Sequence, residues 1–206
     1  MAETDLDIEL IRGVFSHRRV GCQLLHYDVL GSTMDEARAL TQGGEREGTV
    51  VIAEEQTTAR GRFDRVWVSP RGQNVSFSVL LRPSAAQLPY MNMAATLAVS
   101  RAIEGLTGLS TTIKWPNDVR INGRKVSGIL VETEVAGKEV SHAIVGIGVN
   151  VNFDPKYISE SLRVAYDKNE GQRWEEIDEL EKLASRAPVA HWSGTPEYVE
   201  EQRKEI

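Results

Sequence analysis

The segment 111–151 most constrains the fold, because it reads as consecutive β-strands separated by short turns. Asn122-Gly123 and Ala136-Gly137 divide the segment, and Asn-Gly is a typical dipeptide of the tight turn that joins two antiparallel strands. The pattern therefore predicts β-hairpins, and with them a largely antiparallel sheet.

The residues before this segment add helices and further strands. Helical patterns occupy 8–15, 33–42 and 91–108, and strand patterns occupy 22–30, 49–56 and 74–83. Ser32 is suited to cap the second helix, and two glycines follow its end. The sequence predicts an α+β domain in which a mixed, mostly antiparallel sheet is flanked by helices.

The character of the chain changes after residue 152. Residues 153–206 are highly charged and include two helix-like stretches, 174–185 and 195–206. We therefore expect two parts, a core over 1–152 that holds nearly all of the strands and a largely helical C-terminal segment over 153–206.

Composition and charge exclude several classes of protein. The chain has no run of eighteen apolar residues, so no membrane span is expected, and its acidic N-terminus does not resemble a secretory signal. One cysteine, Cys22, rules out an intramolecular disulfide, which fits a cytoplasmic location. The net charge of −6 argues against non-specific binding to nucleic acid, because such binding needs a basic surface.

The segment 59–67, ARGRFDRVW, predicts a loop that binds an anion. It places three arginines around one glycine, namely Arg60, Arg62 and Arg65. Their planar guanidinium groups match the geometry of phosphate oxygens. Trp67 closes the run with a flat face on which a base could stack. On an acidic protein this local positive charge suits a small anionic ligand, although an ordinary solvated basic loop remains the alternative.

Four further segments carry polar or small residues at positions where a ligand could lie. Gly31-Ser32-Thr33 forms a strand-to-helix turn, whose free N–H groups suit a polar head group or serve only as a helix cap. Asn117 and Asp118 follow a strand that ends at Pro116, where an ordinary turn is the alternative.

The other two segments lie in predicted strands. Lys125 begins a strand that should be buried, so its amine either reaches outward or faces an anion, and Gly128 suggests close approach by a ligand or another backbone. Gly146 and Gly148 leave one strand face bare, with room for something flat. The sequence carries no dinucleotide, P-loop, zinc-hydrolase or serine-nucleophile motif.

Taken in order, five motifs resemble the catalytic domain of biotin protein ligases, within the biotin/lipoate ligase family: STMDEA, EEQTTARGRFDRVW, KWPNDV, GRKVSGILVE and GIGVNVN. The resemblance implies the fold shared by class II aminoacyl-tRNA synthetases and biotin ligases. It also implies formation of biotinyl-5′-AMP from biotin and ATP, with Mg²⁺ carried by ATP and no protein-only metal site. Biotin would then pass to a lysine of the biotin carboxyl carrier protein of an acyl-CoA carboxylase.

The resemblance also assigns residues. Those implied for catalysis are Lys125, Asp118 and Arg62, with Lys125 touching the biotin carboxylate and the α-phosphate and Asp118 near the acyl-adenylate. Those implied for biotin are Ser32, Thr33, Gln56, Gly61, Arg60, Arg62, Lys125 and Gly128. Those implied for ATP and the adenylate are Arg60, Arg62, Arg65, Trp67, Lys125, Asn117 and Asn150.

Several departures and alternatives accompany this resemblance. Ala59 and Asp64 replace two glycines of the family's loop, which predicts slower closure or weaker retention of the adenylate. No DNA-binding domain precedes the core and no C-terminal β-barrel is evident after Phe153, so DNA binding is not expected. A homodimer is possible by the resemblance, but the sequence does not reveal the oligomeric state. A ligase for lipoate or another acid, and a non-catalytic module that binds biotin or its adenylate, are the alternative functions.

Overall fold

The computed structural model describes residues 5–15, 19–137 and 139–152, so the predicted C-terminal segment lies outside the described residues. The three helices of this part are α1 (Ile8–Phe15), α2 (Thr33–Gln42) and α3 (Met91–Thr107). The seven strands are β1 (Gln23–Leu30), β2 (Thr49–Gln56), β3 (Asn74–Leu81), β4 (Thr112–Lys114), β5 (Asp118–Ile121), β6 (Arg124–Ala136) and β7 (Glu139–Asn150). Short 3₁₀ turns, Arg62–Asp64 and Leu88–Tyr90, complete these elements.

The strands form one sheet in the order β1-β2-β3-β7-β6-β5-β4. Only β1 and β2 pair in parallel, and every other neighbouring pair is antiparallel. The prediction of an α+β domain with a mostly antiparallel sheet is therefore confirmed. The described helices and strands match the predicted ranges closely, although β3 ends two residues earlier than expected.

Local chemistry explains where these elements begin and turn. Ser32 has extended backbone, and its hydroxyl accepts a hydrogen bond from the Met34 backbone N–H, which is the predicted N-cap of α2. Asn122 and Gly123 have φ angles of 50° and 77°, the backbone conformation that a tight hairpin requires at both central positions. A cis peptide bond joins Trp115 to Pro116 in the turn between β4 and β5.

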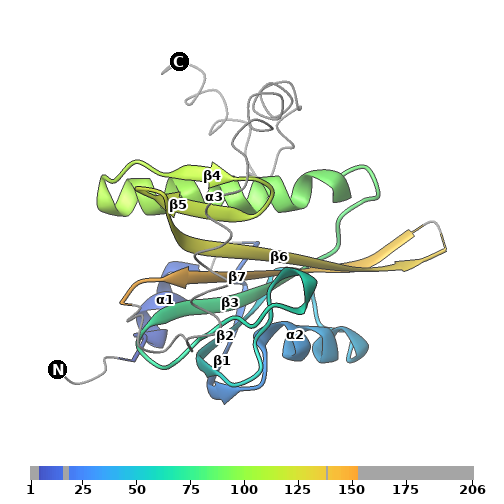
Figure 1. Ribbon diagram of the computed structural model, residues 1–206. Helices are drawn as coiled ribbons and strands as arrows, with labels where there is room; N and C mark the ends of the chain where they lie inside the picture. Colours follow the sequence, from blue (N-terminus) through green and yellow to red (C-terminus); the bar gives the residue numbers. More distant parts are fainter. Residues whose placement is uncertain (1–4, 16–18, 138, 153–206) are drawn as a thin grey trace. The chain divides into compact units, whose positions relative to one another are not determined.

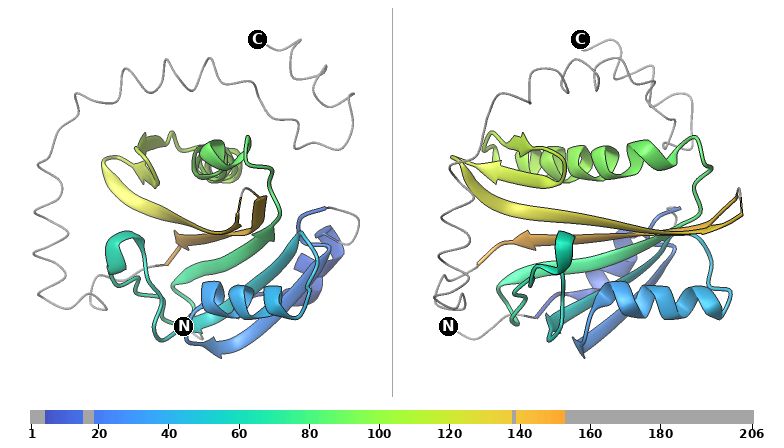
Figure 2. Two further views of the ribbon diagram at one scale, coloured as in Figure 1. Left: turned by 90° about the vertical axis from the view of Figure 1, so that its right-hand side faces the viewer. Right: turned by 45° about the vertical axis from the view of Figure 1, so that its right-hand side comes forward.

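Helices cover both faces of the sheet (Figures 1 and 2). On the face that carries α3, one core cluster gathers residues of the helix and of six strands, including Met91, Val99, Val119, Ile129 and Val145. On the opposite face, a smaller cluster packs α2 against the sheet through Met34, Ala37, Val51, Leu80 and Ile144. We call this second side the α2 face. None of the helices in the described ranges combines the length and the apolar character needed to cross a bilayer.

Candidate active site

The α2 face of the sheet carries an unusual strip of small and polar residues beside its apolar cluster. Ser76 and Ser78 on β3 lie on this face and are almost completely buried. Their partners across the sheet are Gly148 and Gly146 on β7, and Gly148 in turn faces Gly128 on β6. Three neighbouring strands thus present hydroxyls and bare backbone where side chains would normally pack.

Three of the predicted site residues meet at one end of this strip, at the start of α2. The Gln56 carboxamide oxygen accepts hydrogen bonds from the backbone N–H of Thr33 at 2.8 Å and from its hydroxyl at 3.1 Å. Thr33 also bonds to the Ser78 hydroxyl at 2.8 Å. Ser32 is buried beside them and is used as the helix cap. The fold therefore joins Thr33 and Gln56 by hydrogen bonds and places Ser32 beside them as the cap of α2.

The two glycines of β7, Gly146 and Gly148, were predicted to leave room for a flat group. At Gly148 this group is a side chain of the protein itself, the indole of Trp67. A Cβ atom built on Gly148 would lie 2.5 Å from Cε2 of Trp67, and one built on Gly128 would lie 3.2 Å from the same ring. Gly146 instead faces the Met34 side chain. The Trp67 indole thus lies directly on Gly128 and Gly148, which we call the glycine floor, and its Nε1 is buried without a hydrogen-bond partner among the described residues.

Lys125 lies over the same floor. Its Nζ is 2.7 Å from Oδ1 of Asp118 and 5.5 Å from the centre of the Trp67 ring. The register of β5 against β6 shifts between Val119 and Arg120, where β6 has one extra residue, and the side chains of Lys125 and Asp118 are 23% and 19% exposed. The sequence left two alternatives for the Lys125 amine, to reach outward or to face an anion. The amine lies over the sheet, where an anion could meet it.

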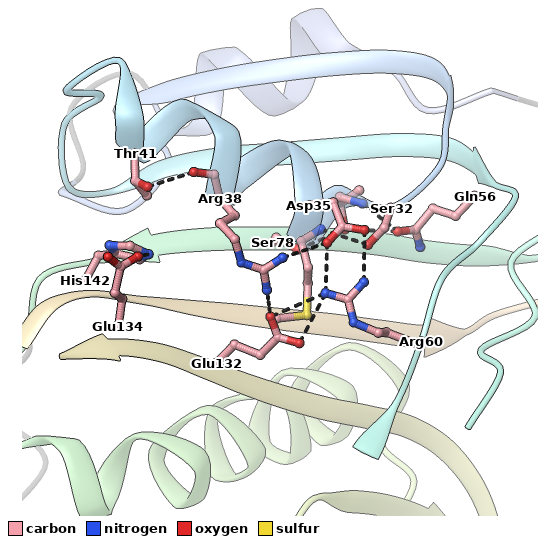
Figure 3. A network of polar contacts seen from close by, with 12 residues as sticks. Ser32, Asp35, Arg38, Thr41, Gln56, Arg60, Ser78, Glu132, Glu134 and His142 are labelled. Carbon is pink, nitrogen blue, oxygen red and sulfur yellow. Dashed lines mark hydrogen bonds and ion pairs between the residues drawn. The ribbon is translucent and has the colours of Figure 1, made fainter. Parts of the chain in front are cut away.

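Arg60 is held by carboxylates (Figure 3). Its guanidinium donates to both oxygens of Asp35, at 2.8 and 2.9 Å, and pairs with Glu132 at 3.3 Å. Arg38 pairs with the same two carboxylates, so two cations and two anions form one network between α2, the loop and β6. The bond from Arg60 lowers the pKa of Asp35 below its usual value, with Arg38 adding to the effect. Sequence reasoning missed Asp35, Arg38 and Glu132.

The rest of the arginine loop folds back on itself. The Gly61 N–H donates to the Arg65 carbonyl at 2.7 Å, and the Trp67 N–H donates to the Ala59 carbonyl at 2.9 Å. Arg62 donates to the Asn117 side-chain oxygen at 3.3 Å, so these two predicted residues meet. Arg65 is exposed, and within the described part of the chain its side chain makes no hydrogen bond to Arg62 or Asn117.

The last predicted residue, Asn150, ends β7 on the α2 face beyond Gly148. Its side-chain oxygen accepts a 2.7 Å hydrogen bond from the amide of Asn74, the first residue of β3. Asn74 was not predicted from the sequence, because its contact depends on strand pairing across 76 residues. Within the described ranges, no group of three or more His, Cys, Asp or Glu side chains could hold a metal ion.

The arrangement combines the glycine floor, on which the Trp67 indole lies, with convergent cations. Lys125 approaches it from β6 and is paired with one carboxylate, Arg62 approaches it from the loop, and Arg60 is held by two carboxylates. Hydroxyl and amide groups at the start of α2 supply neutral hydrogen-bonding partners at the other end. Such a surface is suited to a ligand with one neutral polar end and one anionic end.

Known proteins of similar sequence share this region. One of them is the bifunctional ligase/repressor BirA of Bacillus subtilis, 42% identical over 146 residues that make up 70% of this chain and 45% of that protein. The biotin–[acetyl-CoA-carboxylase] ligase of Paracoccus denitrificans is 42% identical over 131 residues, 60% of this chain and 52% of that protein. The chain thus spans about half the length of these relatives.

Solved structures agree with the sequences. The biotin protein ligase of Aquifex aeolicus in complex with biotin and ATP superposes with a TM-score of 0.54 at 33% identity, over 80% of this chain and 68% of that one. The biotin protein ligase of Leishmania major with biotin gives 0.55 at 29% identity, over 64% and 57%. The family model described as the biotin/lipoate A/B protein ligase family matches residues 28–150, which include all the site residues above, and the chain belongs to this family.

Proposed function

We propose that this chain joins biotin to ATP, forming biotinyl-5′-AMP and pyrophosphate, and then transfers biotin to a lysine amine. The family description covers both biotin and lipoate, so the choice of biotin is supported by the relative and the solved structure that are named as biotin ligases. The relative from Paracoccus, named for acetyl-CoA carboxylase, supports a carrier protein of such a carboxylase as the acceptor.

The observation that carries the proposal is the position of Lys125. Adenylation brings a carboxylate against a phosphate, and two anions approach each other only if their charge is neutralised. Lys125 holds its amine over the glycine floor, oriented by Asp118 and by the face of Trp67. A cation fixed in this way could contact the biotin carboxylate and the α-phosphate at once.

The surrounding residues divide between the two substrates. Ser32, Thr33 and Gln56 would hydrogen-bond the ureido head of biotin. Gly61 would let its rings approach the backbone, and Gly128 would do the same once the Trp67 ring and the Lys125 amine beside it moved aside. The phosphates of ATP would be bound by Arg62, Arg65, Asn117 and Asn150. Arg60 would also bind them once its ion pairs with Asp35 and Glu132 break. Mg²⁺ would arrive with ATP, and Asp118 would orient Lys125 or the incoming acceptor amine.

The direct test is to incubate the chain with labelled biotin, MgATP and a biotin-acceptor domain. Label on the acceptor supports the proposed ligase, pyrophosphate release without transfer limits it to the first half-reaction, and binding alone supports a non-catalytic module. Lys125→Ala should abolish adenylation, because the cation held over the glycine floor is lost. Arg124→Ala, which removes an exposed cation from the neighbouring position on β6, is the matched control and should leave the rate unchanged.

A further inference from the structure

Arg60 of the arginine loop bridges two sides of the α2 face. Its guanidinium donates to both carboxylate oxygens of Asp35 on α2, at 2.8 and 2.9 Å, and lies 3.3 Å from Oε1 of Glu132 on β6. Figure 3 shows this guanidinium lying between the two carboxylates. We call Arg60, Asp35 and Glu132 the carboxylate clasp, because together they tie the loop to a helix and to a strand.

A second arginine shares the two carboxylates of the clasp. Nη1 of Arg38 lies 2.8 Å from Oδ1 of Asp35, one turn earlier on α2, and Nη2 pairs with Oε2 of Glu132. Two carboxylates that share a site repel each other unless a cation lies with them. Because Arg38 would stay with both, the departure of Arg60 would not leave the carboxylates without a counter-ion. The clasp is therefore built so that Arg60 can leave it.

The clasp is also partly open to solvent. The side chains of Arg60 and Glu132 are each 26% exposed, and that of Asp35 is 48% exposed. Ion pairs exposed to this extent are weak, because water and salt screen them. A phosphate group offers a guanidinium several charged oxygens in a matching geometry, so ATP brings a stronger partner than either carboxylate. Phosphate should therefore displace the carboxylates when it reaches the loop.

We propose that the carboxylate clasp is an autoinhibitory contact, in which Asp35 and Glu132 hold Arg60 until a phosphate of ATP takes their place. One cation of the loop is thus occupied before ATP arrives. The apparent affinity for ATP is lowered, because only the molecules in which Arg60 is released bind with full strength. The exchange with phosphate rests on the proposed function, whereas the clasp itself rests on the contacts described above.

Equilibrium titration of the full chain with ATP and Mg²⁺ tests the exchange. Asp35→Asn and Glu132→Gln should each tighten ATP binding about two- to fivefold, the range expected when a partly exposed ion pair is lost. Glu9→Gln is the matched control, because it removes a carboxylate that pairs with Arg12 at 2.8 Å on α1, away from the clasp. It should leave ATP affinity unchanged.

A double-mutant cycle separates the clasp from a general effect of charge. Removing a carboxylate near a bound polyanion could tighten binding through the electrostatic field alone. In the Arg60→Ala background the clasp is absent, so Asp35→Asn should there leave ATP affinity unchanged. Equal tightening in both backgrounds, or no tightening when Arg60 is present, overturns the autoinhibitory role. An unaltered chain that binds no ATP overturns both this role and the proposed function.

A measurement without ATP tests the clasp independently of the proposed function. Trypsin cleaves after arginine and must take up the released side chain, so the clasp should protect the bond between Arg60 and Gly61. Asp35→Asn should speed this cleavage about two- to fivefold in time courses followed by mass spectrometry, whereas Glu9→Gln should not. An unchanged rate overturns the clasp. Faster cleavage in a chain that binds ATP but does not activate biotin supports the clasp and refutes the proposed function alone.

Discussion

Gly148→Ala should destabilise the protein through one specific neighbour, the Trp67 indole. The new methyl carbon would lie 2.5 Å from Cε2 and 2.8 Å from Nε1 of the ring, closer than real Cβ contacts occur. The ring must therefore lift from the floor, and its contact with the Lys125 amine must change.

The expected size follows from two opposing effects. Overpacking a well-filled site costs about 1–3 kcal/mol. Replacing a strand glycine by alanine returns about 0.5–1 kcal/mol of backbone entropy. The free energy of unfolding should thus fall by up to about 2.5 kcal/mol.

A double-mutant cycle followed by urea unfolding isolates this contact. Circular dichroism should be the probe, because tryptophan fluorescence would report the displaced ring directly. In the Trp67→Ala background the clash is absent, so Gly148→Ala should there be neutral or slightly stabilising. Equal destabilisation in both backgrounds would refute the packing of Trp67 on Gly148.

Two further predictions concern the arginine loop. Folding lowers the pKa of Asp35, chiefly through its hydrogen bond with Arg60. This bond should therefore stabilise the folded protein fully at pH values above about 3.9, the pKa of Asp35 in the unfolded chain. The stabilisation should disappear as the pH falls through the lower pKa of Asp35 in the folded protein. Because the Asp35 side chain is 48% exposed, Asp35→Asn should lower the free energy of unfolding by less than about 1 kcal/mol at pH 7, measured by thermal unfolding. This loss should shrink in acid, and a loss that grew as the pH fell would contradict the predicted direction of the pH dependence. The double substitution Ala59→Gly, Asp64→Gly should slow dissociation of biotinyl-AMP in stopped-flow measurements, because it restores flexibility for closure; an unchanged rate would argue against a role for these two departures.

Most of the fold could be predicted from local patterns. The helix over 33–42 and the strand over 49–56 have the bounds expected from Ser32, Gly43 and a run of β-branched residues. The hairpin at Asn122-Gly123 followed from the backbone conformations that these two residues tolerate. These features depend on residues close together in the sequence.

The site could be predicted only in part, because its contacts span the sheet. The bare face at Gly148 was evident, but nothing local indicated that Trp67, 81 residues earlier, lies on it. The pairing of Lys125 with Asp118 depends on a bulge, and the capture of Arg60 depends on Glu132 of a distant strand. Strand order decides these contacts, and the sequence does not display strand order.

The most direct test of the central claim is a crystal structure of the chain with biotinyl-5′-AMP. The account predicts that the acyl-phosphate junction lies within hydrogen-bonding distance of Lys125 Nζ, with the ureido group at Thr33 and Gln56. A ligand bound elsewhere, or an adenylate that lies over Gly128 and Gly148 without touching Lys125, would contradict it.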